Sequence, residues 1–192
     1  VLGIGQKPVY QNDGEVIPAE GFGVKVISMG FFQKDEEEAV IFRGPMIHNV
    51  ITQFLQITNW GDLDYLVVDL PPGTSDSPLT IMQTLTPDGF VIVTTPQELA
   101  KLDARRSINM VKKLNLKILG VVENYTGEIF GSGGGLELAQ DMELPFLGSV
   151  ELRSAYKDST KPPVLVEAAI DKEYENIVSV MKSSLEADAK LD

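Results

Sequence analysis

Short apolar runs alternate along this chain with segments whose apolar residues recur at helical spacing. Five runs are rich in β-branched and aromatic residues, and they cover residues 24–29, 65–70, 90–95, 118–123 and 146–150. Three of them, YLVVDL, FVIVTT and ILGVVE, are nearly continuous rather than alternating. That pattern is typical of strands that are buried on both faces, as in a parallel sheet.

The intervening segments predict helices. In residues 43–57 the apolar positions form pairs four apart, and Pro45 suits a first helical turn. Ser77 and Pro78 predict the N-cap and first position of a second helix. Three more helices are predicted over 98–114, 135–141 and 171–187, the last with a buried stripe of Tyr174, Ile177, Val178, Met181 and Leu185. Alternating strands and helices predict an α/β fold, with right-handed crossovers around a parallel sheet.

Composition narrows the function classes. The 192 residues are enough for one domain, and we expect residues 1–192 to form a single α/β domain. A formal net charge of −12 argues against a broad nucleic-acid-binding surface, because phosphate contacts need clustered lysine and arginine. No apolar run approaches the length of a membrane span, and no signal peptide is recognised at the start. We therefore expect a cytoplasmic protein that contacts neither nucleic acid nor membrane.

Cysteine is absent from the sequence, and His48 is the single histidine. Disulfides are therefore excluded, and so is a metal or iron–sulfur site held by thiolates of this chain. One histidine cannot build a zinc site alone.

The stretch DYLVVDLPPGTSD carries the strongest candidate chemistry. Asp69 is predicted near the end of a buried strand, the edge at which parallel sheets bind their ligands. A buried carboxylate needs a cation or hydrogen-bond donors, and Mg²⁺ reached through water is one natural partner. Pro71 and Pro72 stiffen the next part of the chain, and Gly73 lets a backbone N–H approach a ligand. A carboxylate paired with a lysine before a stiff turn is the alternative.

Three other features leave alternatives open. Asp76 can position an attacking water or accept backbone N–H groups near a helix N-cap, and spacing alone favours the cap. Asn124 can pair with two edges of an adenine, or it can serve a turn. The glycine run 131–135 resembles a phosphate-binding loop but lacks the following lysine, so it is interpreted as a turn into the next helix.

Six segments, in this order, resemble the Mrp/ApbC proteins, which are P-loop ATPases of the MinD/ParA-like class and carry iron–sulfur clusters. The segments are VKVISMGFF, VIFRGPMI, WGDLDYLVVDLPPGTSD, VIVTTPQELAKLDARRSINMVKKLN, ILGVVENY and IFGSGGG. The resemblance runs from the first residues to about Val166. DYLVVDLPPGTSD is specific to this group rather than to P-loop proteins at large.

The resemblance implies roles at matching positions. Asp69 would be the Walker B carboxylate, which binds Mg²⁺ through water. Gly73, with Pro72 and Thr74, would form the switch that senses the γ-phosphate. Asp76 would be a second catalytic residue, although Ser75 replaces the family's glycine before it. The nucleobase would be recognised by Asn124, and Glu151 stands where the family usually has a proline beside the base.

Two departures qualify this resemblance. The family's first βαβ unit, with a deviant Walker A loop that carries two lysines, is expected to be missing, because VLGIGQKPV matches the family segment located directly after that unit. YTGE stands where the family usually has a C-x-x-C loop, which binds a 4Fe–4S cluster across a dimer.

The leading hypothesis is an ATP- and Mg²⁺-dependent ATPase of the Mrp type. It would form a homodimer and deliver iron–sulfur clusters between scaffold and recipient proteins. The alternatives are a MinD/ParA-like ATPase switch without a cluster and a non-catalytic protein-binding module.

Overall fold

The computed structural model describes residues 4, 8–10, 14–32, 52, 54–70, 82, 85–158 and 160–188. The internal contacts of the chain divide it into two compact units, Val1–Leu85 and Thr86–Asp192. Each unit is described by itself below. The single domain expected over 1–192 stays a prediction.

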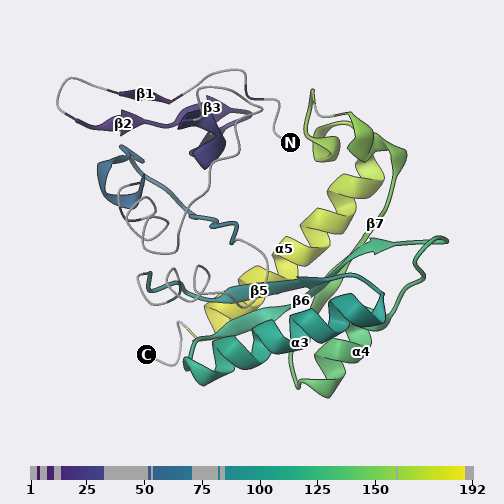
Figure 1. Ribbon diagram of the computed structural model, residues 1–192. Coiled ribbons are helices and arrows are strands. Elements are labelled where there is room, and N and C mark those ends of the chain that lie inside the picture. The colour runs from purple at the N-terminus through teal and green to yellow at the C-terminus, as the bar shows by residue number, and fades with distance from the viewer. Residues whose placement is uncertain are drawn as a thin grey trace. The chain divides into compact units, whose positions relative to one another are not determined.

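The first unit contains two small antiparallel hairpins (Figure 1). β1 (Val9–Tyr10) pairs with β2 (Val16–Ile17), and β3 (Ala19–Gly21) pairs with β4 (Val24–Val26). The second hairpin turns at Phe22 and Gly23, whose φ angles of 53° and 76° are both positive, as a two-residue type I′ turn requires. A 3₁₀ turn, η1 (Met29–Phe32), comes next in the chain.

This hairpin corrects the strand predicted over 24–29. β4 ends at Val26 and is antiparallel, because the tight turn gives it an immediate partner in β3. The helix predicted over 43–57 is described at residues 52 and 54–57, which are helical. Of the helix predicted after Pro78, residue 82 is described and is helical, while Ser77 and Pro78 lie outside the described residues.

The predicted strand over 65–70 is wrong. These residues have no regular secondary structure, and Val67 exposes 89% of its surface. A strand exists only where its backbone joins a ladder, and the pairings in the described part of the chain do not include this run. A continuous apolar run is therefore not enough to make a buried strand here.

The second unit contains a parallel sheet in the order β5–β6–β7. Its strands are β5 (Phe90–Thr94), β6 (Ile118–Thr126) and β7 (Phe146–Glu151). The sequence predicted all three, and β6 continues beyond residue 123 because its last residues still pair with β7.

Two helices cover one face of this sheet and one covers the other (Figure 1). α3 (Glu98–Lys113) and α4 (Gly134–Asp141) pack on the first face, where Ile92, Ile108, Val121 and Leu138 belong to one apolar cluster. α5 (Ala168–Asp188) packs on the other face, where Ile177 joins a cluster of Val122, Leu147 and Val150. Successive residues of β6, Val121 and Val122, enter opposite clusters, so this strand is buried on both faces as predicted.

β5 is not buried on both faces, which corrects the prediction for FVIVTT. Ile92 is buried, but Val91 and Val93 are exposed. Within the second unit α5 packs over β6 and β7, so this helix does not cover the side chains of Val91 and Val93.

The stripe predicted for the last helix is also partly wrong. Ile170 and Ile177 are buried, whereas Tyr174 and Val178 are exposed. Gly148 lets the helix approach β7 closely, since a Cβ there would lie 2.8 Å from Cγ1 of Ile177. Two short 3₁₀ turns, η2 (Ser154–Lys157) and η3 (Pro163–Leu165), connect β7 to α5.

Candidate functional site

The carboxyl ends of β6 and β7 lie together at one edge of the sheet. Asn124 pairs in register with Val150, and Thr126 pairs with Glu151. The N–H of Leu152 donates to the carbonyl of Thr126 at 2.9 Å and extends the contact beyond β7. Two predicted nucleotide-binding residues, Asn124 and Glu151, are therefore brought to neighbouring strand ends.

Asn124 supports a local irregularity in β6. Its Oδ1 accepts a hydrogen bond from the N–H of Tyr125 at 3.0 Å. Tyr125 has a φ of 61°, and the register between β6 and β7 shifts at this point. A non-glycine residue in this region stores strain, a feature that concentrates at binding sites. The side chain of Asn124 thus stabilises a local turn of the backbone, which is one of the two alternatives that the sequence left open. Recognition of adenine by Asn124 stays a prediction.

Glu151 is held by an arginine two residues later. Nη2 of Arg153 lies 2.6 Å from Oε2 of Glu151, and the same guanidinium binds Glu173 of α5 at 2.8 Å. The pKa of Arg153 is raised above its usual value, chiefly by the hydrogen bond to Glu173. The loop after β7 is therefore fixed to the beginning of α5. In the same segment, burial raises the pKa of the Tyr156 hydroxyl.

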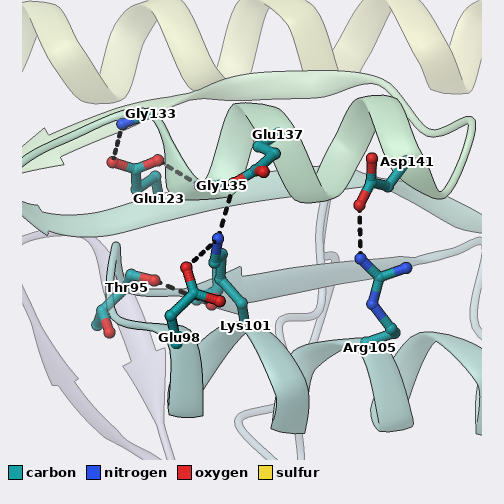
Figure 2. Close-up of polar contacts among 10 residues, drawn as sticks. Thr95, Glu98, Lys101, Arg105, Glu123, Gly133, Gly135, Glu137 and Asp141 are labelled. Carbon is teal, nitrogen blue, oxygen red and sulfur yellow. Dashed lines mark hydrogen bonds and ion pairs between the residues drawn. The ribbon is translucent and has the colours of Figure 1, made fainter.

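Sequence reasoning missed the carboxylate of Glu123, which is 1% exposed. Its Oε1 accepts the N–H of Gly133 at 2.8 Å, and Oε2 accepts the N–H of Gly135 at 2.5 Å (Figure 2). Gly133 is the N-cap of α4 with a φ of 96°. The glycine run is thus a turn into a helix, as predicted, and a buried acid binds the N–H groups at its start.

The signal for Glu123 was present but ambiguous. An acidic residue interrupts an apolar strand eight residues before the glycine run that starts at Gly131. Gly135 must lack a side chain, because a Cβ there would lie 2.7 Å from Cβ of Glu123. The acid and the glycine therefore depend on each other, and Glu123 immediately precedes Asn124.

Ion pairs join α3 to α4 beside this turn (Figure 2). Lys101 lies 2.6 Å from Glu98 and 2.7 Å from Glu137, and Arg105 lies 2.6 Å from Asp141. The pKa of Lys101 is raised above its usual value, first by its hydrogen bond to Glu137 and then by that to Glu98. A groove of about 250 Å³ runs between the two helices, and its charges are already paired with one another. We therefore interpret the groove as a helix–helix interface that ion pairs hold together, rather than as a ligand pocket.

The remaining predicted site residues fall in the first unit. Asp69 is exposed and does not end a buried strand, which corrects its predicted environment. Its role as Walker B carboxylate stays a prediction. Pro72, Gly73, Thr74 and Asp76 lie outside the described residues.

Neither a metal-binding cluster nor a membrane-spanning helix is found among the described residues. They contain no group of three histidine, cysteine, aspartate or glutamate side chains that could hold a metal ion. Among the described helices, none combines the length and apolarity that crossing a membrane requires.

Comparison with known proteins identifies relatives. Residues 1–185 match the ParA-type family model described as NUBPL iron-transfer P-loop NTPase. An iron–sulfur cluster carrier protein of Methanocaldococcus jannaschii is 39% identical over 178 residues, which cover 85% of this chain and 61% of that protein. The cytosolic Fe-S cluster assembly factor CFD1 of Kluyveromyces lactis is 41% identical, with 79% of this chain and 60% of that protein covered. The chain thus spans about three fifths of the length of these relatives.

A solved structure supports the same grouping. The nucleotide-binding protein of Archaeoglobus fulgidus in complex with ADP superposes with a TM-score of 0.64 at 34% identity. The match covers 80% of this chain and 63% of that one. The fold class predicted from sequence is therefore confirmed as α/β and P-loop NTPase-like. The family profile, the related sequences and this structural likeness agree, and the chain belongs to the Mrp/ApbC family of ParA-type, NUBPL-like P-loop NTPases.

Proposed function

We propose that the protein containing this chain is an ATP-hydrolysing carrier of iron–sulfur clusters. The observation that carries the proposal is the family match over residues 1–185, together with relatives named as iron–sulfur cluster carriers. A cytoplasmic location is supported by the name of the CFD1 relative. A homodimer is part of the proposal and derives from the family resemblance.

Each candidate residue suits one part of a bound nucleotide. An exposed carboxylate such as Asp69 suits Mg²⁺, which keeps several waters and binds few carboxylates. The polar side chains of Asn124 and Glu151 at neighbouring strand ends suit the N–H and ring-nitrogen edge of a base. Bound Mg²⁺ would neutralise charge that develops on the phosphates.

The chain's own contribution to hydrolysis would be positioning. Asp69 would orient the waters around the magnesium ion. By family resemblance, Pro72, Gly73 and Thr74 would approach the γ-phosphate and Asp76 would orient the attacking water. Holding a water in line with the phosphate supplies much of the barrier reduction in such reactions.

The iron–sulfur cluster would be the cargo of this protein, and the side chains of this chain do not provide the ligands that such a cluster needs. The 192 residues contain no cysteine, so thiolate ligands for a 4Fe–4S cluster are not among them. Residues 125–128, YTGE, enter a tight turn in which Gly127 and Gly131 exchange backbone hydrogen bonds of 3.0 and 2.8 Å. The thiolates would be supplied by other residues of the protein or by a scaffold or recipient partner.

Two measurements test the proposal on the complete gene product. The first titrates ATP with Mg²⁺ and follows phosphate release, with Asp69→Ala as the variant. We expect ATP binding in both proteins and loss of hydrolysis in the variant, and wild-type turnover in the variant would refute the role of Asp69. If the wild-type protein binds no ATP, the ATPase proposal fails and a protein-binding module is the better description.

The second measurement reconstitutes a cluster and follows its transfer to an acceptor apoprotein. We expect transfer that depends on ATP. The missing cysteines favour one competing function, an ATPase switch of the MinD/ParA type without a cluster. ATP hydrolysis without retention or transfer of a cluster would establish that alternative.

A further inference from the structure

A cluster of one arginine and three glutamates fixes the chain after β7. The guanidinium of Arg153 reaches carboxylate oxygens of Glu151 at 2.6 Å, Glu173 at 2.8 Å and Glu167 at 3.3 Å. The side chain of Arg153 is only 18% exposed. Because Nε, Nη1 and Nη2 all have partners, the guanidinium is restricted to one orientation.

The strongest part of this cluster is the pair with α5. Nη1 and Nη2 of Arg153 each lie 2.8 Å from a different oxygen of Glu173, so the pair is bidentate. Such parallel hydrogen bonds add geometric specificity to the charge attraction. Glu173 thus fixes the position of Arg153 relative to α5, and Arg153 in turn contacts Glu151.

Glu151 uses only one of its two oxygens in the cluster. Its Oε2 accepts from Arg153. A Cβ added to Gly127 would lie 3.6 Å from Cγ and 3.9 Å from Oε1 of Glu151, so Oε1 lies over Gly127, just beyond the end of β6. No residue in the described part of the chain donates a hydrogen bond to this oxygen, and the side chain is 50% exposed.

The charges around Arg153 decide which part of a nucleotide fits here. Three carboxylates share one guanidinium, so the cluster has excess negative charge. That charge repels phosphates and favours N–H donors. Asn124 reaches the same sheet edge from β6.

We propose that Glu151 selects the nucleobase by accepting a hydrogen bond from its exocyclic amino group, and that Arg153 is the residue that positions Glu151. This inference rests on the proposed nucleotide-binding function and deepens it. An ionised carboxylate only accepts hydrogen bonds, so it distinguishes an amino-bearing ring from one without that group. A site built for an N–H group loses affinity when the ligand lacks it, because its acceptor is left unpaired.

The test compares two nucleotides that differ by one amino group. ATP and purine riboside 5′-triphosphate share ribose and phosphates, and only ATP carries the exocyclic amine. Dissociation constants for both are measured by calorimetry with Mg²⁺ on the complete gene product. We expect the wild-type protein to prefer ATP, and Glu151→Ala to reduce the preference about tenfold by removing a charge-assisted hydrogen bond.

Arg153→Met tests the positioning role. This variant keeps the Glu151 carboxylate but releases it, so the preference for ATP should fall in the same direction, and Arg153→Lys should restore part of it. Arg105→Met is the matched control, because it removes another arginine–carboxylate pair, with Asp141, at the α3–α4 interface. The control should keep the wild-type preference.

Each outcome supports or overturns a distinct statement. If the wild-type protein binds neither nucleotide, the proposed function itself fails. If it binds ATP and Glu151→Ala keeps the wild-type preference, the inference is wrong while the function stands, and Glu151 is then a surface partner of Arg153. Equal weakening of both nucleotides by Arg153→Met shows a structural role and refutes positioning. If Arg153→Met fails to fold, Glu151→Ala still decides the base selection, and Arg153→Lys decides the positioning role.

Discussion

The carboxylate of Glu123 binds the backbone of Gly135, with Oε2 2.5 Å from the amide nitrogen. The acid lies near the end of a buried strand and the glycine in the first turn of α4. This contact and the hydrogen bond from the N–H of Gly133 join the central strand to the start of the helix that covers it. Among the described carboxylates, that of Glu123 is the most completely buried. Its partners are backbone N–H groups rather than a cation.

Glu123→Gln should destabilise the protein by about 1–3 kcal/mol, because an amide cannot accept from both backbone N–H groups as a carboxylate does. Urea unfolding followed by circular dichroism measures the change. Glu175→Gln is the control, since Glu175 is exposed on α5 and no ion pair of this carboxylate occurs among the described residues. Equal stability of the two variants would show that the buried contact contributes little.

Gly135→Ala should also destabilise, by about 1–3 kcal/mol, because the new methyl group overpacks the contact with Glu123. Thermal unfolding of the variant measures this effect. Gly30→Ala is a suitable control, because the nearest atom to an added Cβ there is Oγ of Ser28 at 3.7 Å. A Gly135→Ala protein as stable as the control would mean that α4 shifts freely away from β6.

Ile108→Ala should cost about 2–5 kcal/mol, since Ile108 is fully buried between α3 and the sheet and its truncation leaves a cavity. Leu99→Ala on the same helix should have little effect, because Leu99 is largely exposed. Chemical denaturation of the two variants gives the comparison. Similar losses at both positions would contradict the packing of α3.

Lys101→Met should lower stability at neutral pH, and the loss should disappear in strong alkali. The folded-state pKa of Lys101 is raised above 10.5 by its two glutamate partners. The stabilisation is therefore fully present below pH 10.5 and is lost as the pH rises through the folded-state pKa. Urea midpoints of wild type and variant at several pH values test this. Lys113→Met, on the same helix, is the control, because no ion pair of Lys113 occurs among the described residues. A similar loss of stability in both variants would contradict the role of the Lys101 ion pairs.

The sequence pattern predicted the second unit well because its elements carry strong local signals. FVIVT, ILGVVEN and FLGSVE became parallel strands, and the helices of residues 98–114 and 135–141 began and ended within one residue of their predicted bounds. Burial was harder to predict, because it depends on which strand each helix covers. Val93 and Tyr174 are exposed for that reason.

The run YLVVDL shows the limit of such reasoning. Its composition predicts a buried strand, but pairing is a property of neighbours that the run itself does not encode. The candidate site stays a prediction, and the structure shows only where some of its residues lie. Asn124 and Glu151 lie at the carboxyl ends of neighbouring strands, and their nucleotide-binding role stays a prediction. Glu123 and Arg153 could be recognised only through their contacts in the structure.

The exposed valines of β5 have a consequence for the behaviour of the protein at high concentration. β5 is an outer strand of the described sheet, and the side chains of Val91 and Val93 are exposed on one face of this strand. Such outer strands favour strand addition between molecules. The net charge of −12 opposes that encounter through mutual repulsion. Colloidal stability should therefore depend on ionic strength. Added salt screens the repulsion between molecules, so association through β5 should increase with salt concentration.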